Sequence, residues 1–122
     1  MGKSSRDKGK RVEREAAKAV ADALGIEARR SVQFCGRAGD ADLTTSIGDV
    51  HFEVKARAAH SCLRFMQQAK VDAGDAIPVV LLREDRNPRF HALIALDDLA
   101  ELSALIGAAR RLDADPDPPP AA

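Results

Sequence analysis

The sequence contains no tryptophan and no tyrosine, and four phenylalanines are its only aromatic residues among 122. Proteins that read single-stranded nucleic acids stack bases on aromatic rings, so this scarcity argues against sequence-specific recognition of single strands. The two cysteines, Cys35 and Cys62, are too few for a disulfide scaffold, and we expect free thiols. No Cys-x-x-Cys or His-x-x-x-His spacing supports a zinc site that would join these thiols to His51 or His60.

Long apolar runs are also missing. No segment approaches the ~20 residues that a membrane span requires, and no apolar stretch follows the basic N-terminus as it would in a secretory signal. We therefore expect a cytoplasmic protein that does not associate with membranes. The length fits one domain over residues 1–112 with a flexible basic segment at 1–6. Residues 113–122, rich in Pro and Asp, predict a disordered tail.

The net charge is zero, but the charges are unevenly distributed. Residues 1–37 contain ten Lys or Arg against five Asp or Glu, so the rest of the neutral chain carries an equal acidic excess. A basic N-terminal third is a candidate surface for phosphate contacts. A solvated helix flank with a loose basic arm would give the same pattern.

Hydrophobic periodicity predicts a mixed α/β fold, in which helices pack on a single β-sheet. Apolar residues recur every fourth position in a first helix, at Val12, Ala16, Val20 and Leu24. Ser61 is a candidate N-cap for a second helix, whose apolar stripe comprises Leu63, Met66, Ala69 and Ala73. The predicted helices cover 7–24, 62–73 and about 99–112, the last with a capping box from Asp98 and Glu101. The predicted strands cover 41–46, 50–56, 77–83 and 90–95, with an edge strand or a connection at 26–34.

The chemistry concentrates around residues 39–55. Side chains alternate along a strand, so His51, Glu53 and Lys55 share one face, opposite Val50, Phe52 and Val54. If the preceding strand pairs back across the turn at 47–49, Asp42 lies beside Glu53 and Lys55. Two carboxylates and a lysine suit a site that binds Mg²⁺ or Mn²⁺ and hydrolyses a phosphodiester. Glu13, on the rim of the first helix's apolar face, can point toward the same place, whereas Glu15 should be solvated.

Two alternatives remain open at this stage. Glu-x-Lys on an exposed strand is common, and most such pairs are solvated ions that contribute little. Asp40 competes with Asp42 as the acid before the strand.

Six short motifs occur in a particular order along residues 8–96. They are Lys8-Gly9-x-x-x-Glu13-Arg14-Glu15, Arg30-Ser31, Asp42-Leu43, Glu53-Val54-Lys55, Gln68-Ala69 and Pro78-Val79-Val80. In this order and spacing they resemble the PD-(D/E)XK nuclease superfamily, and more narrowly the Holliday-junction resolvases of archaea, phages and prophages. The resemblance implies a restriction-endonuclease-like sheet flanked by helices, in the order α-β-β-β-α-β with an added C-terminal helix. The chain departs from the archaeal pattern in its longer C-terminal extension and in having His60, Cys62 and Arg64 where aromatic and basic residues are common.

The resemblance also implies roles for individual residues. Asp42 and Glu53, with the main-chain carbonyl of Val54, would ligate Mg²⁺ or Mn²⁺, and Glu13 would complete the site directly or through a water. Asp42 is preferred to Asp40 because it directly precedes Leu43, as in the family. Lys55 would orient or help deprotonate the attacking water, and Gln68 would hold water or phosphate nearby. The candidate DNA contacts are Lys8, Lys10, Arg11, Arg14, Arg30, Ser31 and Arg37.

We therefore expect a Mg²⁺-dependent endonuclease that acts on branched or duplex DNA in recombination or repair. A homodimer follows by analogy, because two symmetric cuts require two sites. The last helix, with Leu99, Leu102, Leu105 and Ile106, would either form that dimer interface or cap the sheet. A nicking or repair nuclease of the same superfamily, and a non-catalytic DNA-binding subunit with the same fold, are the alternatives.

Overall fold

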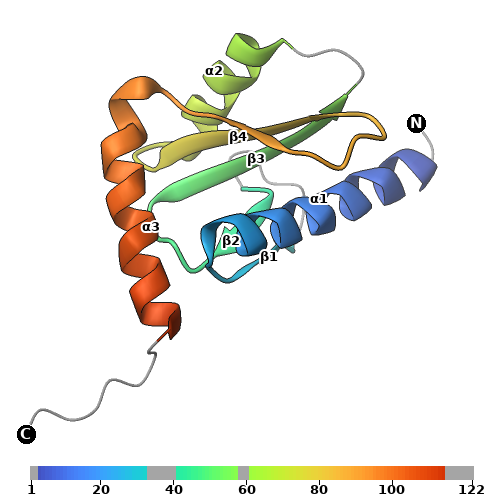
Figure 1. The fold of residues 1–122 in the computed structure, drawn as a ribbon. Helices are drawn as coiled ribbons and strands as arrows, with labels where there is room; N and C mark the ends of the chain where they lie inside the picture. Colours follow the sequence, from blue (N-terminus) through green and yellow to red (C-terminus); the bar gives the residue numbers. More distant parts are fainter. Residues whose placement is uncertain (1–2, 33–40, 58–60, 115–122) are drawn as a thin grey trace, which may run out of the picture.

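The computed structural model describes residues 3–32, 41–57 and 61–114, in which helices and short strands form a mixed α/β fold (Figure 1). The helices are α1 (Lys3–Leu24), α2 (Cys62–Ala73) and α3 (Leu99–Ala114), and a 3₁₀ turn, η1, covers Leu96–Asp98. The strands are β1 (Ala28–Arg30), β2 (Leu43–Thr45), β3 (Val50–Arg57), β4 (Ile77–Glu84) and β5 (His91–Leu93). In Figure 1, α1 and α2 lie on opposite sides of the β3–β4 pair, and α3 stands across one end of it.

The strands form two sheets rather than the single sheet that the sequence predicted. β1 and β2 make an antiparallel pair, while β3 pairs with β4 in parallel and β4 with β5 antiparallel. The two sheets meet where the Asp42 N–H donates to the Phe52 carbonyl over 3.0 Å. The Val54 N–H, which a strand carbonyl would accept in a regular ladder, donates instead to the Asp42 carboxylate. This side-chain acceptor interrupts the β2–β3 pairing.

α1 packs on the sheet through the apolar stripe that the sequence predicted. Val12, Ala16 and Val20 are buried, and Ala17 joins them in the core. The helix begins at Lys3, four residues before the predicted start, because nothing between Lys3 and residue 7 breaks a helix. It ends at Gly25, whose φ of +67° is the left-handed conformation that glycine adopts readily. The N-terminal basic residues thus follow the core along one rigid element.

α2 packs on the sheet through most of the predicted stripe, in which Met66 and Ala73 are half-buried and Leu63 is the exception. Ala69 is buried as expected, but Leu63 is 75% exposed. Six residues separate the two, so at 3.6 residues per turn they lie about 120° apart around the helix. Phe65 and Asp72, which the predicted stripe left out, are half-buried on the sheet-facing side. Ser61 occupies the N-cap position but makes no capping hydrogen bond through its side chain, and Gly74 ends the helix with φ +60°.

The C-terminal part covers one end of the sheet. β4 is central and almost fully buried, as its continuous apolar run predicted. Asp98 lies in η1, which leads directly into α3, and α3 buries Leu102 and Ala109 in the core. The helix therefore caps the sheet, and it continues to Ala114, two residues into the predicted tail. None of the described helices has the length and apolar character that crossing a bilayer requires.

Candidate active site

Asp42 links three strands at the point where the two sheets meet. Its carbonyl accepts the Ser31 N–H over 2.9 Å, next to the end of β1, and its own N–H donates to Phe52 on β3. Its carboxylate oxygen Oδ2 accepts the Val54 N–H at 2.8 Å. Asp42 therefore lies beside the Glu53–Lys55 segment, although β2 pairs with β1 and not with β3 as the predicted hairpin required.

The surroundings of Asp42 raise its pKa from 3.8 to about 6. Burial is the main cause, because it disfavours the charged form, and the hydrogen bond from Val54 opposes it. The charges of Glu53 and Glu13 raise the pKa further, and the charge of Lys55 lowers it. Four of the five predicted catalytic residues are thus close enough to interact, and Gln68 is the fifth. Repulsion among the acids contributes less to the raised pKa than burial does.

Glu53 is held on both sides by basic neighbours. Its Oε1 lies 3.1 Å from Nε2 of His51 and its Oε2 lies 3.8 Å from Nζ of Lys55. Its side chain is only 13% exposed, and that of His51 is 5% exposed. The three side chains lie on one face of β3, as strand alternation predicted. Lys55 Nζ also lies 5.3 Å from the centre of the Phe65 ring on α2, a cation–π contact.

Glu13 comes from α1 and is paired with β1. The Arg30 Nε–H donates to its Oε1 over 2.9 Å, and the side chain of Glu13 is 20% exposed. The Glu13 side chain therefore points inward from α1, as the sequence predicted. Arg30, a predicted DNA contact, neutralises Glu13 in this structure and joins α1 to the β1–β2 sheet.

The tightest set of potential metal ligands differs from the predicted one. Among the described residues, the three ligand atoms that lie within 4.8 Å of one another come from His51, Glu53 and Asp72. Glu53 is common to this set and to the predicted set of Glu13, Asp42 and Glu53. Gln68, a predicted catalytic residue, donates to Asp72 over 3.1 Å and so connects to this cluster through α2.

His51 and Asp72 were not predicted as site residues, although the spacing of each from a predicted site residue was a signal. His51 precedes Glu53 by two positions and therefore shares its face of the strand. Asp72 follows Gln68 by four positions and therefore lies beside it on the helix. Their convergence depends on how α2 packs against β3, and the predicted stripe, which was right at Ala69 but wrong at Leu63, did not include Asp72.

Two hollows with basic walls adjoin α1. The first, of about 360 Å³, lies between α1 and β3 and is lined by Lys8, Glu13, Val54, Lys55 and Arg57, among others. We call it the α1–β3 hollow. It is lined by Glu13 and Lys55, two of the five predicted catalytic residues, and by Val54, whose N–H donates to Asp42.

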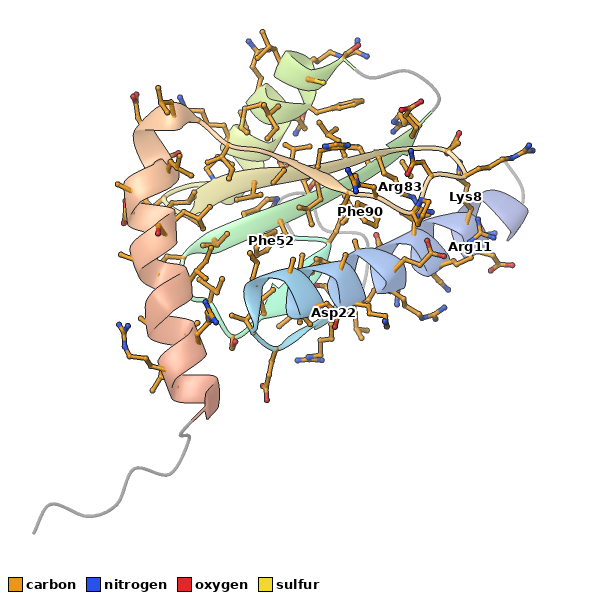
Figure 2. The ribbon with its side chains drawn as sticks, in the orientation of Figure 1. Lys8, Arg11, Asp22, Phe52, Arg83 and Phe90 are labelled. Atoms are coloured by element: carbon orange, nitrogen blue, oxygen red, sulfur yellow. The ribbon has the colours of Figure 1, made fainter. Side chains whose placement is uncertain are left out.

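The second hollow lies beyond Lys8, toward the β4–β5 turn. It measures about 550 Å³, and the basic residues that line it are Lys8, Arg11, Arg83 and Arg86. Figure 2 shows Lys8, Arg11 and Arg83 gathered at this end of the molecule. Arg83 is buried, lies over the ring of Phe90 and pairs with Glu15 at 2.5 Å. Glu15 is exposed, as predicted, and it also pairs with this buried guanidinium.

The predicted DNA contacts fall into three groups. Lys10 and Arg14 are exposed on α1. Lys8 pairs with Asp85 at 2.7 Å, Arg11 with Glu15 at 4.0 Å, and the Ser31 and Thr44 hydroxyls lie 2.9 Å apart. Arg37 lies outside the described residues, as do Asp40, His60 and Cys35. If the protein binds DNA, each paired Lys or Arg would exchange its acidic partner for a phosphate group.

Comparison of the chain with protein-family models, with curated proteins and with solved structures finds no match. The resemblance to nucleases therefore rests on the motifs of the sequence alone.

Proposed function

We propose that this protein is a metal-dependent DNA endonuclease that hydrolyses phosphodiester bonds in branched DNA, as a Holliday-junction resolvase does. One observation carries the proposal. Asp42 is a half-buried carboxyl group with a pKa of about 6, and the charges of Glu13, Glu53 and Lys55 act on it. A carboxyl group with a shifted pKa, grouped with other acids beside a lysine, is more characteristic of catalytic sites than of solvated ion pairs.

The donor set fits Mg²⁺ or Mn²⁺. Both cations prefer oxygen ligands, and Asp42 and Glu53 supply carboxylates from adjacent strands. A cation beside Asp42 would favour its ionised form and offset the penalty of burial. When bound, such a cation supplies charge that makes a water a better nucleophile and balances the charge that builds up on the phosphate.

Each residue of the site has a role in this proposal. Asp42 and Glu53 hold the cation, together with the carbonyl of Val54. Arg30 already occupies one oxygen of Glu13, so we assign Glu13 an indirect contact through water. Lys55, held near Glu53 and against Phe65, orients the attacking water and stabilises negative charge on the phosphate. Gln68 acts farther out, through Asp72.

The hydrolysis itself consumes one water. A bond forms between the water oxygen and phosphorus, one ester P–O bond breaks, and a proton reaches the sugar oxygen that leaves. The basic residues of the α1–β3 hollow, Lys8 and Arg57, hold the phosphate backbone on either side of the reacting group. Two such sites related by a twofold axis would cut paired strands, so we also propose a homodimer.

A substrate panel tests the proposal. Labelled four-way junctions, linear duplex, nicked duplex and single-stranded DNA are incubated with the protein and Mg²⁺, Mn²⁺ or EDTA. Paired symmetric cuts in the junction that EDTA abolishes would support a resolvase. Metal-dependent cutting of another DNA structure would keep the nuclease and overturn the resolvase.

A second candidate is a DNA-binding subunit without catalysis. The observation that favours it is that the acids already have partners: Glu13 has Arg30, and Glu53 has His51. Such pairs stabilise the acids without a cation. Junction binding without cutting of any substrate in either metal would select this candidate.

A further inference from the structure

His51, Glu53 and Asp72 form a cluster between β3 and α2, on the sheet face opposite α1. The imidazole Nε2 and the two carboxylate oxygens lie within 4.8 Å of one another. His51 is buried, and Glu53 and Asp72 are half-buried, so a cation between them would be largely shielded from water. Strand alternation directs His51 and Glu53 to the same face, and α2 brings Asp72 over them.

The spacing of the three atoms suits one shared cation. Two ligand atoms that each lie roughly 2.1 Å from a Zn²⁺ ion are at most about 4.2 Å apart. Nε2 of His51 and Oε1 of Glu53 are already 3.1 Å apart, within that limit. Asp72 needs only a small side-chain adjustment to reach the same point. Gln68, which donates to Oδ1 of Asp72, would orient the carboxylate, as residues behind metal ligands commonly do.

The chemistry of the ligands selects the kind of cation. A buried imidazole nitrogen is a good ligand for Zn²⁺ and similar transition metals, whereas Mg²⁺ requires oxygen and keeps much of its water. Two carboxylates and one imidazole also give a cluster that a divalent cation neutralises. No Cys or His spacing in the sequence indicated zinc, because these ligands come from a strand and a helix that are distant in the chain.

We propose that His51, Glu53 and Asp72 form a transition-metal site that takes Zn²⁺ and is distinct from the Asp42 site. The site shares Glu53 with the proposed nuclease centre but does not depend on nuclease activity. Where that activity exists, Zn²⁺ held by His51 and Asp72 would draw Glu53 away from Asp42. The site would then inhibit Mg²⁺-dependent cleavage.

The direct test is a Zn²⁺ titration followed by NMR of the histidine ring nitrogens in the full chain. We expect a large shift of the His51 ring nitrogens as Zn²⁺ is added, with no shift at the exposed His91. The spectra of His91→Asn and His60→Asn assign the signals of the other two histidines, so that the remaining signal belongs to His51. This measurement needs no change at the buried His51, so it does not depend on a variant that fails to fold.

Isothermal titration with Zn²⁺ then compares variants. Asp72→Asn should weaken Zn²⁺ binding by at least about tenfold, since even residues behind a ligand change metal affinity by that amount. Asp42→Asn and His91→Asn should bind Zn²⁺ as the wild type does. Unshifted His51 nitrogens at saturating Zn²⁺, or full affinity in Asp72→Asn, would overturn the site and leave the nuclease proposal unaffected.

Discussion

Asp42 is the residue on which the local electrostatics and the local backbone structure both depend. Its carboxylate substitutes for a strand carbonyl at Val54, yet burial and two neighbouring acids disfavour its ionised form. The ionised form of Asp42 is therefore less favourable in the folded protein than in the unfolded chain.

The raised pKa of Asp42 predicts a pH-dependent difference between the wild type and Asp42→Asn. The folded state binds the Asp42 proton more tightly than the unfolded state, so wild-type stability should fall as pH rises from about 4 to about 6. Asn keeps an oxygen that can accept the Val54 N–H but does not ionise. Between about pH 4 and pH 8, the free energy of unfolding should shift in the variant's favour by roughly 3 kcal/mol.

Urea denaturation without added metal, repeated across this pH range, measures that shift. If the difference in unfolding free energy between the variant and the wild type stayed constant with pH, the prediction would be contradicted. Asp42 would then ionise as freely in the folded protein as in the unfolded chain.

At the scale of elements, the ends of the helices determine how the site is assembled. Gly25 lets the chain turn back from α1 into β1, which brings Arg30 to Glu13. A Cβ at Gly25 would lie 3.1 Å from Nε of Arg110, besides requiring a positive φ. Gly107, in the interior of α3, has only an ordinary contact 3.6 Å away.

These two glycines predict effects of opposite sign. Gly25→Ala should destabilise the protein by about 1 kcal/mol or more, because a side chain disfavours the left-handed conformation. Gly107→Ala should stabilise it by up to about 1 kcal/mol, because alanine is the better helix former. Thermal unfolding monitored by circular dichroism compares them. Equal effects of the two substitutions would contradict the assigned ends of the helices.

The sequence predicted the elements better than their pairing. Alternation along β3 correctly placed His51, Glu53 and Lys55 on one face. The acid before Leu43 lies beside β3, but β2 pairs with β1 rather than with β3 as the hairpin required. The α2 stripe was right at Met66, Ala69 and Ala73 and wrong at Leu63. Asp72, which lies beside the stripe, was missed because packing rather than periodicity decides which neighbouring side chains reach the sheet. The division into two sheets depends on one side-chain hydrogen bond, which no pattern of residue types predicts.

At the scale of the whole molecule, the structure shows which elements carry the basic excess of the sequence. The basic excess of the N-terminal third follows α1, and Lys55, Arg57 and Arg86 extend it on the sheet and the β4–β5 turn. A neutral chain can therefore present a positive surface along one helix. Phosphate backbones bind such surfaces with strong dependence on salt.

Arg57 offers a test of this surface, since it lines the α1–β3 hollow and lies 5.6 Å from the ring centre of Phe65. Arg57→Gln should weaken binding to DNA of any sequence and reduce the slope of log affinity against log salt by about 1. Lys18→Gln is the matched control, because Lys18 is exposed on α1 and paired with Asp22 outside both hollows. Fluorescence anisotropy with labelled DNA measures the salt dependence of affinity for both variants. If the two variants had identical slopes, the DNA would not contact Arg57.

The most direct test of the central claim is the single-turnover cleavage rate of Glu53→Gln on a four-way junction in Mg²⁺, with the dissociation constant measured alongside. Glu101→Gln, which removes an exposed carboxylate on α3, is the control. We predict a rate at least about a hundredfold below wild type in Glu53→Gln, with DNA affinity retained and the control unaffected. Cleavage by Glu53→Gln at the wild-type rate would show that the site around Asp42 and Glu53 is not the catalytic centre.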